Sequence, residues 1–294
     1  MKYQLKNKFL SVDFDNYGGG IVSIKDKDNL EYLWQGDSNY WSGQAPVMFP
    51  ICGSIRDNKA KIGQDMTCSM ERHGIVRKLD FNLVSKTDKS ITFMIQSNKE
   101  LKVKFPYDFE LHITYLLNDK TITTEYTVYN KNNIPMPFFI GGHPGFNCPL
   151  LPDEEFQDYV IEFEKPEYAL CPESIPATGL INVDHRTLYL DHEDTLRLKH
   201  SYFDVDALIF DHLKSRSVKL INPNTGRGIQ EDFSDFDYFI LWSSSNKGPF
   251  IALEPWTGLS TCNDESDIFE EKRGVRILKP HESNTLSFQI TILN

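Results

Sequence analysis

Apolar and polar positions alternate with a period of two along most of the chain. Apolar residues at every second position, many of them β-branched or aromatic, predict half-buried antiparallel strands. The clearest such segments are Ser90–Gln96, Asp108–Leu117, Thr121–Tyr129 and Thr285–Leu293. Helical periodicity is confined to the acidic stretch after Asp264, which predicts one or two helical turns with Asp264 as N-cap. We therefore expect an all-β protein.

Turn-forming residues separate the predicted strands. Residues Tyr17–Gly20, Asn118–Lys120 and Asn222–Gly226 combine Gly, Pro, Asn or Asp, which favour tight reversals. The absence of predicted crossover helices excludes a parallel sheet, and no repeat or linker divides the chain. About twenty strands in one run must split into two packed sheets to bury their apolar faces. Residues 1–294 are therefore predicted to form a single domain, a large antiparallel β-sandwich.

Composition narrows the class of protein further. The chain has 31 Lys and Arg against 42 Asp and Glu, a net charge of −11, which disfavours nucleic acid and anionic lipid as partners. Its five cysteines lack C-x-x-C spacing, so we expect neither a disulfide framework nor a cysteine zinc site. No signal-like N-terminal region and no apolar run long enough to span a bilayer is present. We expect a cytoplasmic protein.

A histidine lies within an unusual backbone segment, Phe138–Asn147. There an apolar strand ends in two glycines, His143 and Pro144. The glycines leave room for a ligand and the proline restricts the backbone, so His143 is a candidate proton carrier. The structural alternative is a buried histidine that is hydrogen-bonded to a backbone carbonyl.

A carboxylate lies in a comparable position within Pro249–Gly258. Glu254 ends an apolar strand and is followed by Pro255 and Trp256. Partial burial beside an aromatic ring would raise its pKa toward neutrality and make it a usable base. The structural alternative is a rim carboxylate paired with a Lys or Arg.

Further polar residues are candidates for binding a ligand rich in oxygen atoms. Arg56 follows an apolar run and would present a fork of donors. His73 precedes a glycine on the next segment. Either Asp204 or Asp206, just before an apolar strand, could cap that strand or accept hydrogen bonds from hydroxyl groups.

Other residues are interpreted as structural. Arg72 and Arg77 are expected to be solvated or salt-bridged, and Trp34, Trp41 and Trp242 to be core residues rather than sugar-stacking platforms. No phosphate-binding loop, nucleophile elbow or zinc-protease motif is present. The four histidines between residues 185 and 212 lack metal-ligand spacing, so we expect no zinc site there.

The order of four motifs resembles the aldose 1-epimerase (galactose mutarotase) superfamily, in particular its galactose mutarotase-like branch. The motifs are Phe-Pro-x-x-Gly-x-x-Arg, His-Gly, Gly-His-Pro-x-Phe-Asn and Leu-Glu-Pro-Trp-Thr-Gly. The resemblance implies a supersandwich fold with a sugar-binding cleft, and an isomerase that interconverts the α and β anomers of an aldohexose without a cofactor. It implies that Glu254 is the base and His143 the acid, and that Arg56, His73 and Asp206 bind the sugar.

The resemblance also implies a charge order and leaves the substrate open. His143 would be protonated while Glu254 is ionised, which gives a bell-shaped pH profile. Gly145 stands where the best-known mutarotases have an aromatic residue, and Ile55 precedes Arg56 where they have an Asn.

Several alternatives therefore stand beside the free hexose. The basic residues Lys59, Lys61, Arg72 and Arg77 would suit a hexose 6-phosphate 1-epimerase. A non-catalytic sugar-binding homologue and a glycosidase, which needs a second carboxylate, are further alternatives. The expected partner is a small-molecule sugar, and the expected assembly is a monomer or a homodimer.

Overall fold

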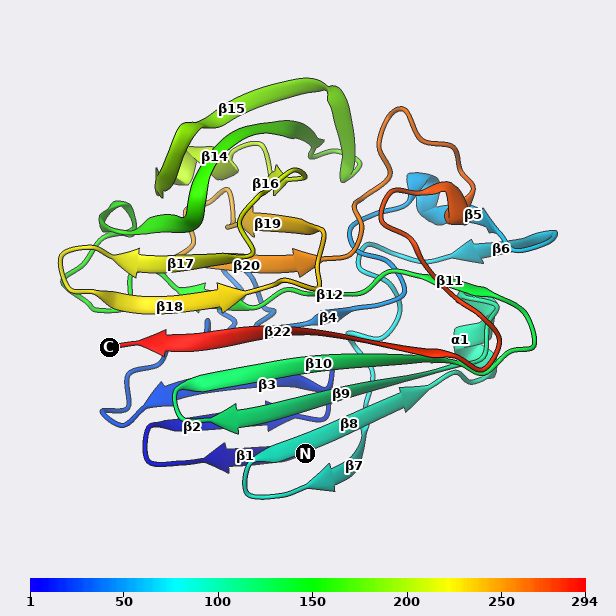
Figure 1. The fold of residues 1–294 in the computed structure, drawn as a ribbon, viewed down its shortest axis with the longest axis horizontal. Helices are drawn as coiled ribbons and strands as arrows, with labels where there is room; N and C mark the ends of the chain where they lie inside the picture. The colour runs from blue at the N-terminus through cyan, green and yellow to red at the C-terminus, as the bar shows by residue number, and fades with distance from the viewer.

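The computed structural model describes residues 1–294, which fold almost entirely into antiparallel strands (Figure 1). The largest sheet has nine strands. In spatial order they are β15 (Leu180–Arg197), β14 (Val160–Ile175), β17 (Ser217–Asn222), β18 (Arg227–Asp232), β22 (Ser283–Leu293), β10 (Thr121–Asn130), β9 (Phe109–Asn118), β8 (Ser90–Gln96) and β7 (Asn82–Lys86).

A second, six-stranded sheet carries the residues of greatest chemical interest. Its strands are β16 (Ala207–Phe210), β19 (Tyr238–Trp242), β20 (Phe250–Trp256), β12 (Gly141–Gly142) and β4 (Val47–Met48), with β13 (Gly145–Asn147) also paired to β20. Three small sheets complete the fold: β1 (Lys2–Lys6), β2 (Leu10–Asp15) and β3 (Gly20–Asp26); β5 (Lys59–Ile62) and β6 (Met66–Ser69); and β11 (Met136–Phe138) with β21 (Arg276–Leu278). The predicted all-β antiparallel architecture is confirmed.

The apolar faces of the sheets meet in one hydrophobic core of 75 buried residues that extends from Leu5 to Ile292. Strands β9 and β10 alternate buried and partly exposed residues along their length, as the period-two pattern predicts. Each fully buried aliphatic or aromatic side chain contributes about 1.5–3 kcal/mol to stability. All five cysteines are buried free thiols.

The turns form where the sequence predicts them. Asp119 has a φ of 49° between β9 and β10, and Gly226 has a φ of 69° between β17 and β18. Asp and Gly adopt this left-handed conformation more readily than most residues do. The four strands predicted most clearly agree with β8, β9, β10 and β22 to within two residues at each end.

The helix prediction was wrong. After Asp264 only a short 3₁₀ helix forms, η4 (Phe269–Glu271), and the carboxylate of Asp264 instead accepts a hydrogen bond of 2.8 Å from Arg273. The α-helix of the protein is α1 (Lys99–Lys104), capped by Asn98, whose side chain accepts the backbone N–H of Leu101 at 2.9 Å. Its six residues are too few to produce a recognisable helical period. The other 3₁₀ helices are η1 (Arg56–Asn58), η2 (Phe156–Asp158) and η3 (His200–Phe203).

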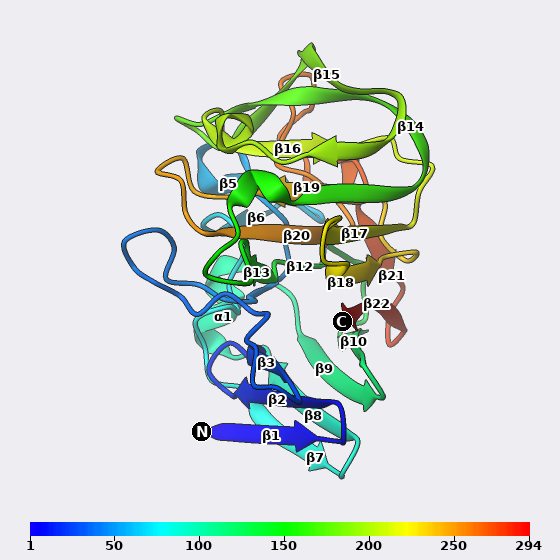
Figure 2. The same cartoon turned by 90° about the vertical axis from the view of Figure 1, so that its left-hand side faces the viewer.

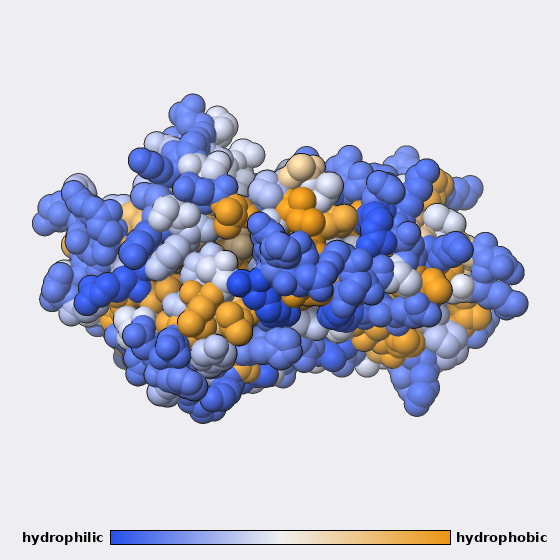
Figure 3. Space-filling view, turned by 90° about the horizontal axis from the view of Figure 1, so that it is seen from above, coloured by the Kyte–Doolittle hydropathy of each residue, from blue (hydrophilic) through white to orange (hydrophobic).

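The long hairpin of β14 and β15 arches over β16 and β19 (Figure 1, Figure 2). The molecule seen from that side is mostly hydrophilic, with separate apolar patches (Figure 3). Exposed apolar side chains on this hairpin include Tyr168, Leu170 and Leu188. None of the helices has the length and apolar character needed to cross a membrane.

Candidate active site

The strand register brings His143 and Glu254 together. β12 and β13 both pair with β20, and Pro144, which has no backbone N–H, lies in the interruption between them. The paired positions on either side of this interruption are Gly141 with Trp256 and Gly145 with Ala252. His143 and Glu254 are midway between these pairs, so they stand opposite each other on neighbouring strands and their side chains share one face of the sheet.

The two side chains are in direct contact. His143 Nε2 lies 3.3 Å from Glu254 Oε2, and Trp256 Nε1 donates to the same oxygen at 3.2 Å. Only Oε2 of Glu254 has a protein partner, so Oε1 is available to a ligand. His143 Nδ1 is buried without any hydrogen-bond partner. Neither structural alternative holds, because His143 is not hydrogen-bonded to a carbonyl and Glu254 is not paired with a Lys or Arg.

A cavity of about 210 Å³ that opens to solvent contains this pair. His73, Asp206 and Arg72 also line the cavity. The predicted residues Glu254, His143, His73 and Asp206 are thus brought together, although they come from four separate segments of the chain.

His73 presents a hydrogen-bond donor to the cavity. Its backbone has a φ of 70°, and its N–H donates to the carbonyl of Gly53 at 2.8 Å. In return Gly53 N–H donates to His73 Nδ1 at 3.2 Å. Burial lowers the pKa of His73 well below its ordinary value, and the nearby His143 lowers it further. The neutral ring that accepts at Nδ1 carries its proton on Nε2.

Asp206, not Asp204, lines the cavity. It has a φ of 84° just before β16, and its Oδ2 lies 3.3 Å from Nη2 of Arg72. Asp204 is exposed on the outer surface. The structure thus selects between the two aspartates, and it places Arg72, which we interpreted as having no special role, on the cavity wall.

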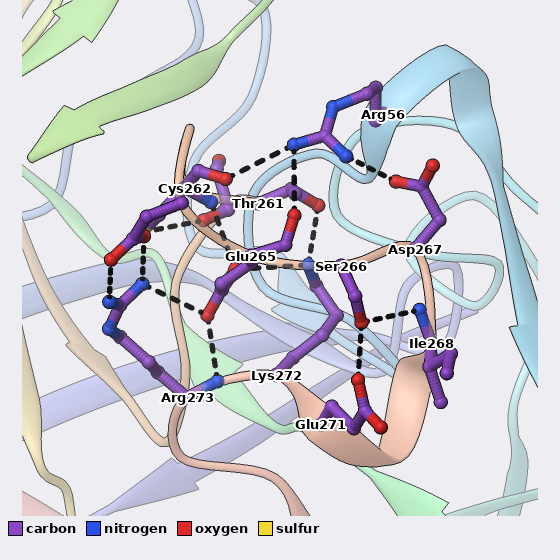
Figure 4. A network of polar contacts seen from close by, with 12 residues as sticks. Arg56, Thr261, Cys262, Glu265, Ser266, Asp267, Ile268, Glu271, Lys272 and Arg273 are labelled. Atoms are coloured by element: carbon purple, nitrogen blue, oxygen red, sulfur yellow. Dashed lines mark hydrogen bonds and ion pairs between the residues drawn. The ribbon is translucent and has the colours of Figure 1, made fainter.

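The structure corrects the prediction for Arg56. Its guanidinium pairs with Asp267 and donates to the carbonyls of Cys262 at 3.2 Å and Glu265 at 3.3 Å (Figure 4). It does not line the cavity, because η1 directs it toward the loop after β20. That loop is held further by Lys272, whose Nζ lies 3.2 Å from Glu265. Arg56 therefore has a structural role here.

Besides Arg72, three further cavity residues were interpreted as structural in the sequence analysis. Arg77 lines the cavity, as do Trp41 and Trp242, which we expected in the core. The Trp41 ring stacks on the His143 imidazole with centroids 4.8 Å apart and planes inclined by 30°. A Cβ at Gly145 would lie 2.8 Å from Trp41 Cζ3, so the glycine leaves the space that this ring occupies.

The remaining tryptophans fit the expectations from the sequence. Trp34 is buried in the core, where its ring stacks on Phe250, as predicted. Trp256 is also buried, and it hydrogen-bonds Glu254. A signal for the cavity residues was present for Arg72 and Arg77, because both lie on the same short segment as His73.

Burial dominates the electrostatics of the central pair. It raises the pKa of the Glu254 carboxyl well above its ordinary value and lowers the pKa of His143 to about 3. Both shifts disfavour the charged form in a site shielded from water. The free cavity therefore favours a neutral pair in which Glu254 holds the proton. Burial thus disfavours, while the cavity is empty, the charged pair that we expect for ring opening. No group of three or more His, Cys, Asp or Glu side chains is arranged to hold a metal ion.

Comparison with known proteins agrees with this fold. The chain is 48% identical to the chromosomal protein LacX of Lactococcus lactis and 47% identical to the plasmid LacX of the same species, over the full length of each chain. The galactose mutarotase related enzyme of Lactobacillus acidophilus shares 26% identity and a TM-score of 0.93, with 99% of this chain and 97% of that one covered.

A second solved structure is similarly close. The galactose mutarotase-like protein of Lactobacillus casei shares 30% identity and a TM-score of 0.90, with 99% of this chain and 100% of that one covered. The family description "Aldose 1-epimerase" matches residues 1–291. The chain therefore belongs to the aldose 1-epimerase family.

Proposed function

We propose that this protein is an aldose 1-epimerase that interconverts the α and β anomers of an aldohexose by acid/base ring opening. The observation that carries this proposal is the contact of 3.3 Å between His143 and Glu254 in an open cavity. Anomer exchange needs one group to accept the C1 hydroxyl proton and another to protonate the ring oxygen. Those two oxygens are bonded to the same carbon, so the two catalytic groups must be close neighbours.

The proton transfers of the reaction balance when Glu254 and His143 together carry one proton. Glu254 takes the C1 hydroxyl proton through its free Oε1 while His143 donates a proton to the ring oxygen, and the C1–O5 bond breaks to give the open-chain aldehyde. Rotation about C1–C2 presents the other face of the carbonyl. Ring closure reverses both transfers, which restores the protons of Glu254 and His143 to their starting places. No covalent intermediate forms between protein and sugar.

The two protonation forms of the pair match the two halves of this reaction. Ionised Glu254 with protonated His143 acts on the closed ring, whereas neutral His143 with protonated Glu254 acts on the open-chain aldehyde. Burial favours the neutral form in the empty cavity. Hydroxyl groups of a bound sugar donate to Glu254 and accept from His143, so they stabilise the charged form. The pair therefore has access to both forms during one turnover.

The surrounding residues orient the sugar. The Nε2–H of His73 donates to a ring or hydroxyl oxygen, and Asp206, held by Arg72 at 3.3 Å, accepts from sugar hydroxyls. Trp41 and Trp242 offer aromatic faces on which the apolar side of a sugar ring packs.

Polarimetry tests this proposal. Freshly dissolved α anomers of glucose and galactose, and α-glucose 6-phosphate followed by NMR, are mixed with the purified protein. Acceleration of the approach to anomeric equilibrium for any of these sugars supports the proposal. Sugar binding without acceleration would indicate a non-catalytic homologue, and release of reducing sugar from a glycoside would indicate a hydrolase.

A further inference from the structure

Trp256 lies beside the catalytic pair on the same face of β20. It follows Glu254 by two positions, and side chains two positions apart on a strand point to the same side of the sheet. Strand β19 pairs with β20 at both positions, with Ile240 opposite Glu254 and Tyr238 opposite Trp256. Both side chains are buried. The strand therefore fixes the indole and the carboxylate relative to each other.

The two carboxylate oxygens of Glu254 have different surroundings. Oε2 lies 3.2 Å from Trp256 Nε1 and 3.3 Å from His143 Nε2, whereas Oε1 has no hydrogen-bond partner in the protein. An indole N–H donates hydrogen bonds and accepts none. Trp256 therefore keeps Oε2 as an acceptor, so a proton on Glu254 resides on Oε1. That oxygen is the one that the proposed mechanism presents to the C1 hydroxyl.

The indole of Trp34 provides a comparison within the same protein. Trp34 Nε1 donates at 2.8 Å to the backbone carbonyl of Trp41, a neutral acceptor of the kind that commonly satisfies a buried indole. Trp256 donates to an ionisable group instead, and a hydrogen bond is stronger when its acceptor is ionised. Burial raises the pKa of Glu254, and the hydrogen bond from Trp256 partly offsets that rise. The indole thus favours the carboxylate over the carboxylic acid.

We propose that Trp256 is a positioning residue for anomer exchange: its indole N–H holds Oε2 of Glu254, leaves Oε1 to exchange a proton with the sugar, and stabilises the carboxylate that begins ring opening. This inference rests on the proposed function and adds a residue to it. Trp256 transfers no proton itself. It acts through Glu254, so its removal should slow the chemical step more than it weakens sugar binding.

The kinetics of Trp256→Phe test this role, because phenylalanine keeps an aromatic ring and removes the N–H. We expect kcat to fall by about 10–100-fold, the size expected for a lost hydrogen bond to an ionised group, with KM changed by less than about threefold. Trp256→benzothienylalanine, with sulfur in place of the N–H, preserves the shape of the indole and is expected to behave alike. Wild-type kcat in this isostere would overturn the proposal.

Trp242→Phe is the matched control. Trp242 lines the same cavity, whereas the indole that donates to Glu254 is that of Trp256. We expect the Trp242 variant to change KM for sugar more than kcat. A loss of kcat of the same size in both variants would show that any change in the cavity lining slows the reaction, and would contradict the assignment to Trp256.

The pH profile separates positioning from a purely structural role. Without the N–H the carboxylate loses a donor, so the pKa of Glu254 rises above its wild-type value. We expect the alkaline limb of kcat/KM in Trp256→Phe to move by about one pH unit to higher pH, and the acid limb, set by His143, to stay. The other charged or titratable groups that line the cavity are unchanged: Arg72, His73, Arg77, His143 and Asp206. An alkaline limb that does not move would contradict the proposal.

Indole NMR separates this inference from the proposed function. The four tryptophans give four indole N–H signals, and loss of one in Trp256→Phe assigns that of Trp256. We expect this signal to titrate with Glu254 and to stop titrating in Glu254→Gln. Such titration in a protein that exchanges no anomers would uphold the coupling of indole and carboxylate and refute the proposed function. Wild-type anomer exchange in Trp256→Phe would uphold the proposed function and overturn the inference.

Discussion

His143 Nε2 lies 3.3 Å from Glu254 Oε2, because the two residues stand opposite each other between the points where β12 and β13 pair with the same edge of β20. The interruption at Pro144 leaves both side chains on the face of the sheet that borders the cavity. An acid and a base this close hold one proton in common. That relationship leads to the following predictions.

The pH dependence of anomer exchange is expected to have two widely separated limbs. Activity needs one proton on the pair. Because burial lowers the pKa of His143 to about 3, the second proton binds, and activity falls, only well below the ordinary histidine pKa. Because burial raises the pKa of Glu254, the last proton is lost well above the ordinary carboxyl value. A kcat/KM profile with its acid limb near the ordinary histidine value would contradict this.

We expect that the Trp41 ring needs the space left by the missing side chain of Gly145. In Gly145→Ala the new Cβ would lie 2.8 Å from Trp41 Cζ3, so the ring that stacks on His143 must move. We expect kcat/KM to fall by about 10–100-fold, since a shift of about 1 Å at a catalytic group has effects of this size. Gly226→Ala, in a turn outside the cavity, is the control: its left-handed φ of 69° makes Ala there lower the stability, but we expect its kinetics to match the wild type. Wild-type kinetics in Gly145→Ala would refute a role for the Trp41 ring.

Arg56→Ala is expected to affect stability and not the KM for sugar. Its guanidinium joins η1 to the loop that carries Cys262 and Asp267, outside the cavity. We expect the free energy of unfolding in urea to fall by about 1–3 kcal/mol. A raised KM with unchanged stability would restore the binding role expected from the sequence.

The sequence alone predicted the strands and the pair of His143 and Glu254. It did not predict most of the residues that line the cavity. Alternation and turn residues determine a strand locally, and His143 and Glu254 lie in segments whose Gly and Pro already mark unusual backbone. Arg56 and Arg77 could not be told apart in this way. Which of two arginines enters a cavity depends on how distant loops pack, and the only hint in the sequence was that Arg77 shares a short segment with His73.

The positions of Trp41 and Trp242 in the cavity lining could not be predicted from the sequence either. Trp41 lies in an irregular loop, and only the folded chain brings that loop over β13 to fill the space left at Gly145. The charge state of the catalytic pair in the empty cavity could not be predicted from the sequence either, because it depends on how far both groups are removed from water. A sequence gives the residue types but not this degree of burial.

A second buried carboxyl, Glu231 on β18, is expected to limit stability. It is fully buried, neither of its oxygens has a partner, and burial raises its pKa well above the ordinary value. A raised folded-state pKa means that its contribution is most favourable below the unfolded value of about 4.3 and is lost as the pH rises toward the folded value.

Glu231→Leu removes this pH-dependent cost. We expect the free energy of unfolding at pH 7 to increase by about 1–4 kcal/mol, with a smaller gain at about pH 5. Urea unfolding of both proteins at the two pH values measures the difference. A variant less stable than the wild type at pH 7 would show that the carboxylate contributes favourably to folding.

The central claim is that Glu254 and His143 together move the protons of anomer exchange, and their substitution tests it most directly. Exchange rates are measured by NMR for the wild type, Glu254→Gln and His143→Asn, with urea unfolding as the check on folding and Arg56→Ala as a control outside the cavity. We predict that each of the first two variants loses activity by about 10²–10⁴-fold while it unfolds cooperatively. Exchange within tenfold of the wild type in either folded variant would contradict the account.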